Sequence, residues 1–170
     1  LVGSEMCIRD RMTEKADMRR AMIFLQKYGI SLNLGAKIYQ KYGQTVYGVL
    51  QENPYRLAED ISGVGFRIAD EIASRIGIHT DSDYRIRSGM LYTLLQASGE
   101  GHIYLPKEEL FSRASGLLGV DSSYMEKHLM DMVVDRKLIL KETEDGAVVY
   151  PTRYYYLELN SARMLCELNI

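Results

Sequence analysis

The chain has 170 residues, of which 46% are hydrophobic and 26% are charged, as is typical of a globular protein with one domain or two small ones. No uninterrupted apolar run approaches the roughly 20 residues that cross a bilayer, so we expect no membrane partner. The two cysteines, Cys7 and Cys166, lack CxxC spacing and neighbouring histidines. This pattern argues against a disulfide scaffold or a zinc site and favours a cytoplasmic location.

The net charge of −2 is unfavourable for binding nucleic acid, but the charges are unevenly distributed. Between Met18 and Gln51 there is no acid, whereas from Asp81 to the end ten cations accompany fourteen acids. The cations in the acid-free run are Arg19, Arg20, Lys27, Lys37 and Lys41. We therefore expect the first third of the chain to attract phosphate.

The first elements in chain order are helices separated by glycines. Residues 1–12 have no clear helical or strand period, and we expect them to be a non-native or disordered segment. Thr13 is a suitable cap for a helix that ends at Gly29. The further predicted helices cover residues 32–42, 46–50, 54–60 and 66–76.

Two passages of this region repeat at a distance of 34 residues, Gly29-Ile30-Ser31 and Gly63-Val64-Gly65. An aliphatic–small pair follows each passage, Leu34-Gly35 in the first copy and Ile68-Ala69 in the second. A duplicated helical unit can bury a core that neither copy closes alone. The repeat predicts a tandem helix-hairpin-helix over residues 13–80.

The second half of the chain follows a different plan. Its predicted elements are a connecting helix (81–100) capped at Asp81 or Ser82, an extended segment (102–105), a helix from Pro106, a helix with the capping box Ser123-x-x-Glu126, and a hairpin turning at Asp145-Gly146. This order predicts a winged helix over residues 101–151, so the whole fold is mainly α with a small β-hairpin. Residues 152–170 form a periodic segment without a final cap, and we expect them to be a helix that leads into a further domain.

The segment from Gly63 to Arg67 carries the strongest functional pattern. Its glycines permit close approach of a partner, and the amides of Gly63, Gly65 and Phe66 are expected to face outward at a helix N-terminus. A phosphate oxygen fits there, and Arg67 adds a positive charge. In the first copy Ser31 replaces the second glycine, and Lys37 supplies a charge near Gly29. The alternative is that both passages are only tight helix–helix turns.

Three stretches of the sequence resemble the region before the motor domains of RecD-like ATP-dependent DNA helicases. They are GISLNLGAKIYQKYG, ENPYRLAEDISGVGFRIADEIASRIGI and RIRSGMLYTLLQASGEGHIYLPKEEL, and the resemblance extends over residues 18–165. The runs Asn53-Pro54-Tyr55-Arg56-Leu57 and Gly101-His102-x-Tyr104-Leu105-Pro106 carry it more specifically than the hairpins. The resemblance implies a superfamily 1 motor that unwinds DNA 5′ to 3′ in repair or recombination, with ATP and Mg²⁺ as its cofactors.

The chain itself contains no G-x-x-x-x-G-K-[ST] loop, so we expect no catalytic residue, cofactor or metal site in it. The expected partners are DNA, as a single strand or a single/double-strand junction, and the motor domains of the parent protein. A protein-interaction scaffold without DNA contact is the alternative. The acidic residues of the predicted second winged-helix helix, with Glu126 and Asp131 among them, favour that role for the second half. Among the tyrosines, Tyr39 is the expected candidate for stacking on a base.

Overall fold

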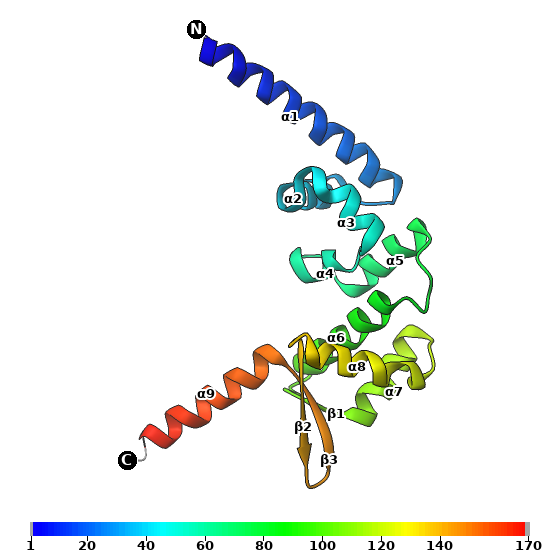
Figure 1. The fold of residues 1–170 in the computed structure, drawn as a ribbon, viewed down its shortest axis with the longest axis vertical. Helices are drawn as coiled ribbons and strands as arrows, with labels where there is room; N and C mark the ends of the chain where they lie inside the picture. The colour runs from blue at the N-terminus through cyan, green and yellow to red at the C-terminus, as the bar shows by residue number, and fades with distance from the viewer. Residues whose placement is uncertain (1, 169–170) are drawn as a thin grey trace. The chain divides into compact units, whose positions relative to one another are not determined.

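The computed structural model describes residues 2–168, with side chains from Cys7 onward, as two compact units. Unit 1 comprises Leu1–His79 and unit 2 comprises Thr80–Ile170. Their elements are drawn in Figure 1. The predicted class is confirmed, because the protein is mainly α-helical with one small antiparallel sheet. Within the described part of the chain, no helix is long and apolar enough to span a membrane.

Unit 1 is entirely helical over its described residues. Its elements are α1 (Val2–Lys27), α2 (Leu32–Tyr42), the 3-10 turn η1 (Gly43–Thr45), α3 (Val46–Glu52), α4 (Arg56–Asp60) and α5 (Phe66–Ile76). The apolar residues that repeat at helical spacing form its core, which includes Leu25, Ile38, Leu50, Leu57 and Ile72. Ser31 caps α2, and the left-handed Gly77 ends α5, so both of these helices have the predicted bounds.

The first helix begins much earlier than the sequence predicts. α1 starts at Val2, whereas Thr13 was expected to cap it. Instead, the Thr13 hydroxyl donates a hydrogen bond to the carbonyl of Arg9 at 2.9 Å, which is a bond of the helix interior. Residues 2–12 contain no proline and include glutamate, methionine and arginine, which have high helix propensity. The predicted irregular structure of this segment is therefore not found in its described residues.

Unit 2 combines helices with a three-stranded sheet. Its elements are α6 (Asp83–Gly99), β1 (Leu105–Pro106), α7 (Lys107–Leu118), the 3-10 turn η2 (Ser122–Tyr124), α8 (Met125–Val134), β2 (Leu138–Thr143), β3 (Gly146–Pro151) and α9 (Thr152–Leu168). The sheet is antiparallel in the order β1-β3-β2, with Leu105 opposite Val149 and Thr143 opposite Gly146. The β2–β3 hairpin projects from α6, α7 and α8, and α9 extends away from the rest of the unit (Figure 1).

The helices of unit 2 pack closely where glycine permits it. A Cβ on Gly89 of α6 would lie 2.6 Å from a methyl carbon of Leu118 in α7, so the two helices meet at a position where only hydrogen fits. The predicted capping box of the following helix is wrong. Asp121, and not Ser123, provides the cap, since its Oδ1 accepts a hydrogen bond from the Ser123 amide at 3.0 Å. The extra turn η2 then precedes α8.

Candidate nucleic-acid interface

The second hairpin of unit 1 is an open bend between α4 and α5. Gly63 has a positive φ of 96°, a conformation that glycine adopts without strain, and Val64 is 5% exposed because it fills the space beneath the bend. Gly65 is extended and caps α5. A Cβ placed on Gly63 or Gly65 would meet no heavy atom within 4 Å. The bend is therefore open at both glycine positions.

Backbone donors and a cation lie at the start of α5, directly after this bend. The first backbone hydrogen bond of α5 runs from the Ala69 amide to the Gly65 carbonyl at 3.2 Å, so the preceding N–H groups lack helical acceptors. The positive end of the helix dipole lies at the same place. Arg67, in the first turn, is exposed and makes no hydrogen bond or ion pair with another described residue. An anion such as a phosphate oxygen is the ligand that this arrangement favours.

Buried aromatic residues hold the second hairpin from within. The Phe66 ring is 2% exposed and stacks on Tyr55 with the ring centres 5.7 Å apart. The Tyr55 hydroxyl donates to Asp70 Oδ1 at 2.7 Å, and its amide donates to Asn53 Oδ1 at 3.2 Å. Phe66, a predicted DNA-binding residue, thus offers its backbone and not its ring. The Asn53-Pro54-Tyr55 run supports the hairpin and does not form its surface.

A second set of contacts fixes α4, the helix that leads into the hairpin. The Tyr42 hydroxyl at the end of α2 donates to Asp60 Oδ2 at 2.5 Å, and the Arg56 guanidinium lies 5.9 Å from the centre of the Tyr42 ring. Burial, together with the hydrogen bond to Asp60, raises the pKa of Tyr42 above its usual value. Arg56 and Asp60 therefore have structural partners inside unit 1.

The first hairpin repeats the backbone pattern of the second. Gly29 has a φ of 78°, and Ile30 is 4% exposed in the position equivalent to Val64. Ser31 occupies the place of the second glycine, and its Oγ accepts a hydrogen bond from the Leu34 amide at 3.4 Å. Lys37 is exposed and has no ion-pair partner among the described residues. The sequence repeat is thus a structural repeat.

The surroundings of the two hairpins differ at one point that the sequence did not indicate. A Cβ on Gly29 would lie 2.0 Å from Nη1 of Arg75, so the guanidinium of Arg75 packs directly against this glycine. Arg75 Nη2 also donates to Glu71 Oε1 at 2.7 Å. Because Arg75 belongs to the last turn of α5, the helix that starts at the second hairpin ends with its cation on the first. No local sequence pattern reveals this contact.

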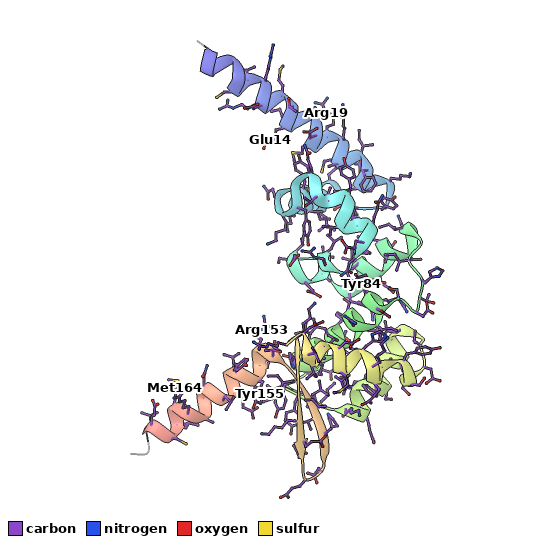
Figure 2. The ribbon with its side chains drawn as sticks, in the orientation of Figure 1. Glu14, Arg19, Tyr84, Arg153, Tyr155 and Met164 are labelled. Atoms are coloured by element: carbon purple, nitrogen blue, oxygen red, sulfur yellow. The ribbon has the colours of Figure 1, made fainter. Side chains whose placement is uncertain are left out.

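The acid-free run of the sequence has carboxylates near it in space. Burial, and then the carboxylates of Asp17 and Glu14 in α1, raise the pKa of Tyr39, the predicted stacking residue. Figure 2 labels Glu14 and Arg19 on this helix. Tyr39 is also partly buried. The surroundings of Tyr39 are therefore more acidic than the acid-free run of the sequence suggests.

In unit 2 the acids of α8 are paired with cations from neighbouring helices. Arg87 of α6 lies 2.9 Å from Asp131 and 3.8 Å from Asp135, and Lys107 of α7 lies 2.7 Å from Glu126. These acids are exposed to solvent and at the same time have cationic partners within their own unit. A helix that carries acids paired in this way is poorly suited to enter a phosphate-lined groove.

Two glycine bends, each with a buried aliphatic residue and each leading into a helix N-terminus, define unit 1 as a helix-hairpin-helix domain, a class that generally binds DNA. Residues 14–104, just over half of the chain, match the family described as the ATP-dependent RecD2 DNA helicase HHH domain. The chain belongs to this family, and the resemblance found in the sequence is confirmed.

Proposed function

We propose that the chain is a non-sequence-specific DNA-binding module of a cytoplasmic RecD2-type helicase that acts in repair or recombination. In this function the hairpin amides hold phosphates of the DNA backbone and leave the bases unread. The observation that carries the proposal is the open bend from Gly63 to Gly65 beside the unpaired Arg67. Motor domains of the parent protein, with ATP and Mg²⁺, would supply the unwinding.

The seven predicted contact residues are assigned different roles in this proposal. Gly63, Gly65 and Phe66 contribute backbone amides, and Arg67 contributes a charge. At the first hairpin Gly29 and Ser31 shape the bend, and Lys37 supplies the charge. We place the stronger contact at the second hairpin, because its glycines are uncovered whereas Gly29 is covered by Arg75.

A salt series on the whole chain tests the role of Arg67. Binding to a single-stranded oligonucleotide, measured by fluorescence anisotropy, is expected to weaken with salt, and Arg67→Ala should reduce the slope of log K against log[salt] by about 0.7, one phosphate contact. Lys127→Ala is the matched control, because Lys127 is an exposed cation of α8 in unit 2. An unchanged slope for Arg67→Ala would remove this residue from the interface.

The glycine bend is tested by Gly65→Val. Gly65 has a φ of −89°, and a Cβ there meets no heavy atom within 4 Å, so the variant is expected to keep its helical content in circular dichroism. Its DNA affinity should fall, since the new side chain stands where the strand approaches. Normal affinity together with normal folding would show that the bend only packs helices.

For unit 2 we infer a winged helix with a supporting role. The order β1, α7, α8, β2, β3 and the antiparallel β1-β3-β2 sheet support this assignment. The ion pairs that hold Glu126, Asp131 and Asp135 to α6 and α7 favour a scaffold over a groove-reading helix. If Lys127→Ala changed the salt slope as much as Arg67→Ala, this division of roles would be wrong.

A further inference from the structure

Three aromatic side chains of unit 1 form a continuous cluster next to the first hairpin. Phe24 and Tyr28 of the α1 region meet edge to face with ring centres 5.1 Å apart, and Phe24 lies 4.7 Å from the ring of Tyr47 in α3. All three side chains are partly exposed. We call Phe24, Tyr28 and Tyr47 the aromatic cluster. The stacked pair of Tyr55 and Phe66, by contrast, is buried.

Cations without protein partners flank the aromatic cluster. Arg20 and Lys27 are exposed on α1, and neither forms an ion pair with another described residue. Arg20 and Tyr47 line a shallow pocket of about 200 Å³ together with Asp17 and Gln44. The one carboxylate of this pocket, that of Asp17, accepts a hydrogen bond from Gln44 Nε2 at 2.7 Å. At about 200 Å³, the pocket is smaller than the roughly 300–1,000 Å³ of sites for drug-sized molecules.

The surface beside Tyr47 is also left open by the following residue. Gly48 lies inside α3, where glycine costs about 1 kcal/mol relative to alanine. A Cβ on Gly48 would meet no heavy atom within 4 Å, so close packing of the protein does not require a glycine there. The surface of α3 is therefore open at Gly48 itself.

We propose that the aromatic cluster stacks on an unpaired base of single-stranded DNA, with Arg20 and Lys27 holding the phosphates on either side. Partly exposed rings beside cations are the combination by which proteins bind single strands without reading sequence. Tyr28 directly precedes Gly29, so a strand on the cluster is led to the first hairpin. This inference rests on the proposed DNA binding and adds the kind of DNA: a strand with exposed bases.

Two strands that differ only in their bases provide the test. The whole chain is titrated with a single-stranded oligonucleotide and with the same backbone carrying abasic sugars. Stacking on one aromatic residue typically contributes about 1–3 kcal/mol, so the strand with bases should bind about five-fold tighter or more. Equal binding of the two strands would overturn the proposal, and this comparison requires no variant.

Variants test whether the preference for the strand with bases comes from the aromatic cluster. Tyr47→Leu should remove most of the difference between the strands, whereas Tyr47→Phe should retain it, because the ring and not the hydroxyl stacks. Tyr124→Leu is the matched control, since Tyr124 is 57% exposed in unit 2. A 2-aminopurine base in the strand should lose fluorescence on binding the original chain and not on binding Tyr47→Leu. An undiminished preference in Tyr47→Leu would overturn the assignment.

Tyr47→Leu could lose DNA binding because its packing is disturbed, so a second measurement uses variants at exposed cations. It also distinguishes the stacking proposal from the hairpin proposal. Arg20→Ala, at an exposed position, should reduce the salt slope for the strand with bases by about 0.7. An unchanged slope would count against the proposed phosphate contact. Arg67→Ala should reduce the slope for both strands and leave the preference for bases intact. If the preference persists while Arg67→Ala and Gly65→Val have no effect, the hairpin function fails and the stacking site stands.

Discussion

Glycine has two different tasks at equivalent residues of the two hairpins. Gly63 has a positive φ and an open surface, so its importance for folding comes from its backbone alone. Gly29 has a positive φ as well, and in addition it admits the guanidinium of Arg75. The repeated residue type therefore serves an exposed bend in one copy and a contact between helices in the other.

This difference gives a prediction for Gly29→Ala. The left-handed backbone is unfavourable for alanine, and the Arg75 side chain has to move, so the free energy of unfolding should fall by about 1–2 kcal/mol. Urea denaturation measures it. Gly48→Ala is the control, because Gly48 lies inside α3, has no positive φ and has an open surface, so its stability should be unchanged or slightly higher. Equal losses in both variants would contradict this explanation.

At the scale of elements, a buried histidine of α8 lies beside the start of α6. His128 is 4% exposed, and its Nε2 lies 3.5 Å from Asp83 Oδ1. Its buried Nδ1 has no hydrogen-bond partner among the described residues. Burial lowers the pKa of His128 below its usual value of 6.5, an effect that the Asp83 carboxylate only partly opposes. The folded protein therefore prefers the neutral imidazole.

The consequence is a loss of stability in mild acid. Above the unfolded pKa of 6.5 the histidine is neutral in both states and has no effect. As the pH falls below that value, the unfolded chain binds a proton more readily than the folded one, so the free energy of unfolding decreases. His128→Gln should flatten the profile measured between about pH 7 and pH 5. His102→Gln, at an exposed position, should leave it unchanged, and an unaltered profile in His128→Gln would refute the assignment.

For the whole molecule, the division into two units separates the charges. The 21 cations and 23 acids of the chain divide into 11 and 9 in Leu1–His79 and into 10 and 14 in Thr80–Ile170, so the units carry net charges of +2 and −4. Each unit has its own buried residues. Attraction for phosphate is thus concentrated in unit 1, although the net charge of the chain is negative.

Separate expression of the two units tests this division. Residues 1–79 should bind DNA with nearly the salt slope of the whole chain, and residues 80–170 should bind weakly, once circular dichroism has shown both to be helical. The basis is that the open hairpin with Arg67, and the cations Arg20 and Lys27 beside the aromatic cluster, lie in unit 1. Comparable, salt-dependent binding by residues 80–170 would show that the second unit contacts DNA directly.

The sequence by itself determined the features that depend on neighbouring residues. The helices predicted over residues 32–42 and 66–76 have these bounds, because their caps, Ser31 and Gly77, act within a few residues of the chain. The period of apolar residues likewise predicted the mainly α fold and the hairpin repeat. Local rules failed where two local arrangements competed: the Thr13 hydroxyl bonds within a longer helix, and Asp121 caps in place of Ser123.

Only the tertiary structure decided which distant residues meet. Arg75 lies against Gly29, and Tyr47 lies against Phe24, although neither pair shares an element. Asp131 is held by Arg87, which changes how an acidic helix is interpreted. The physical reason is that such contacts follow from how helices pack against one another, and a pattern of residues along one helix specifies which face is buried but not which partner covers it.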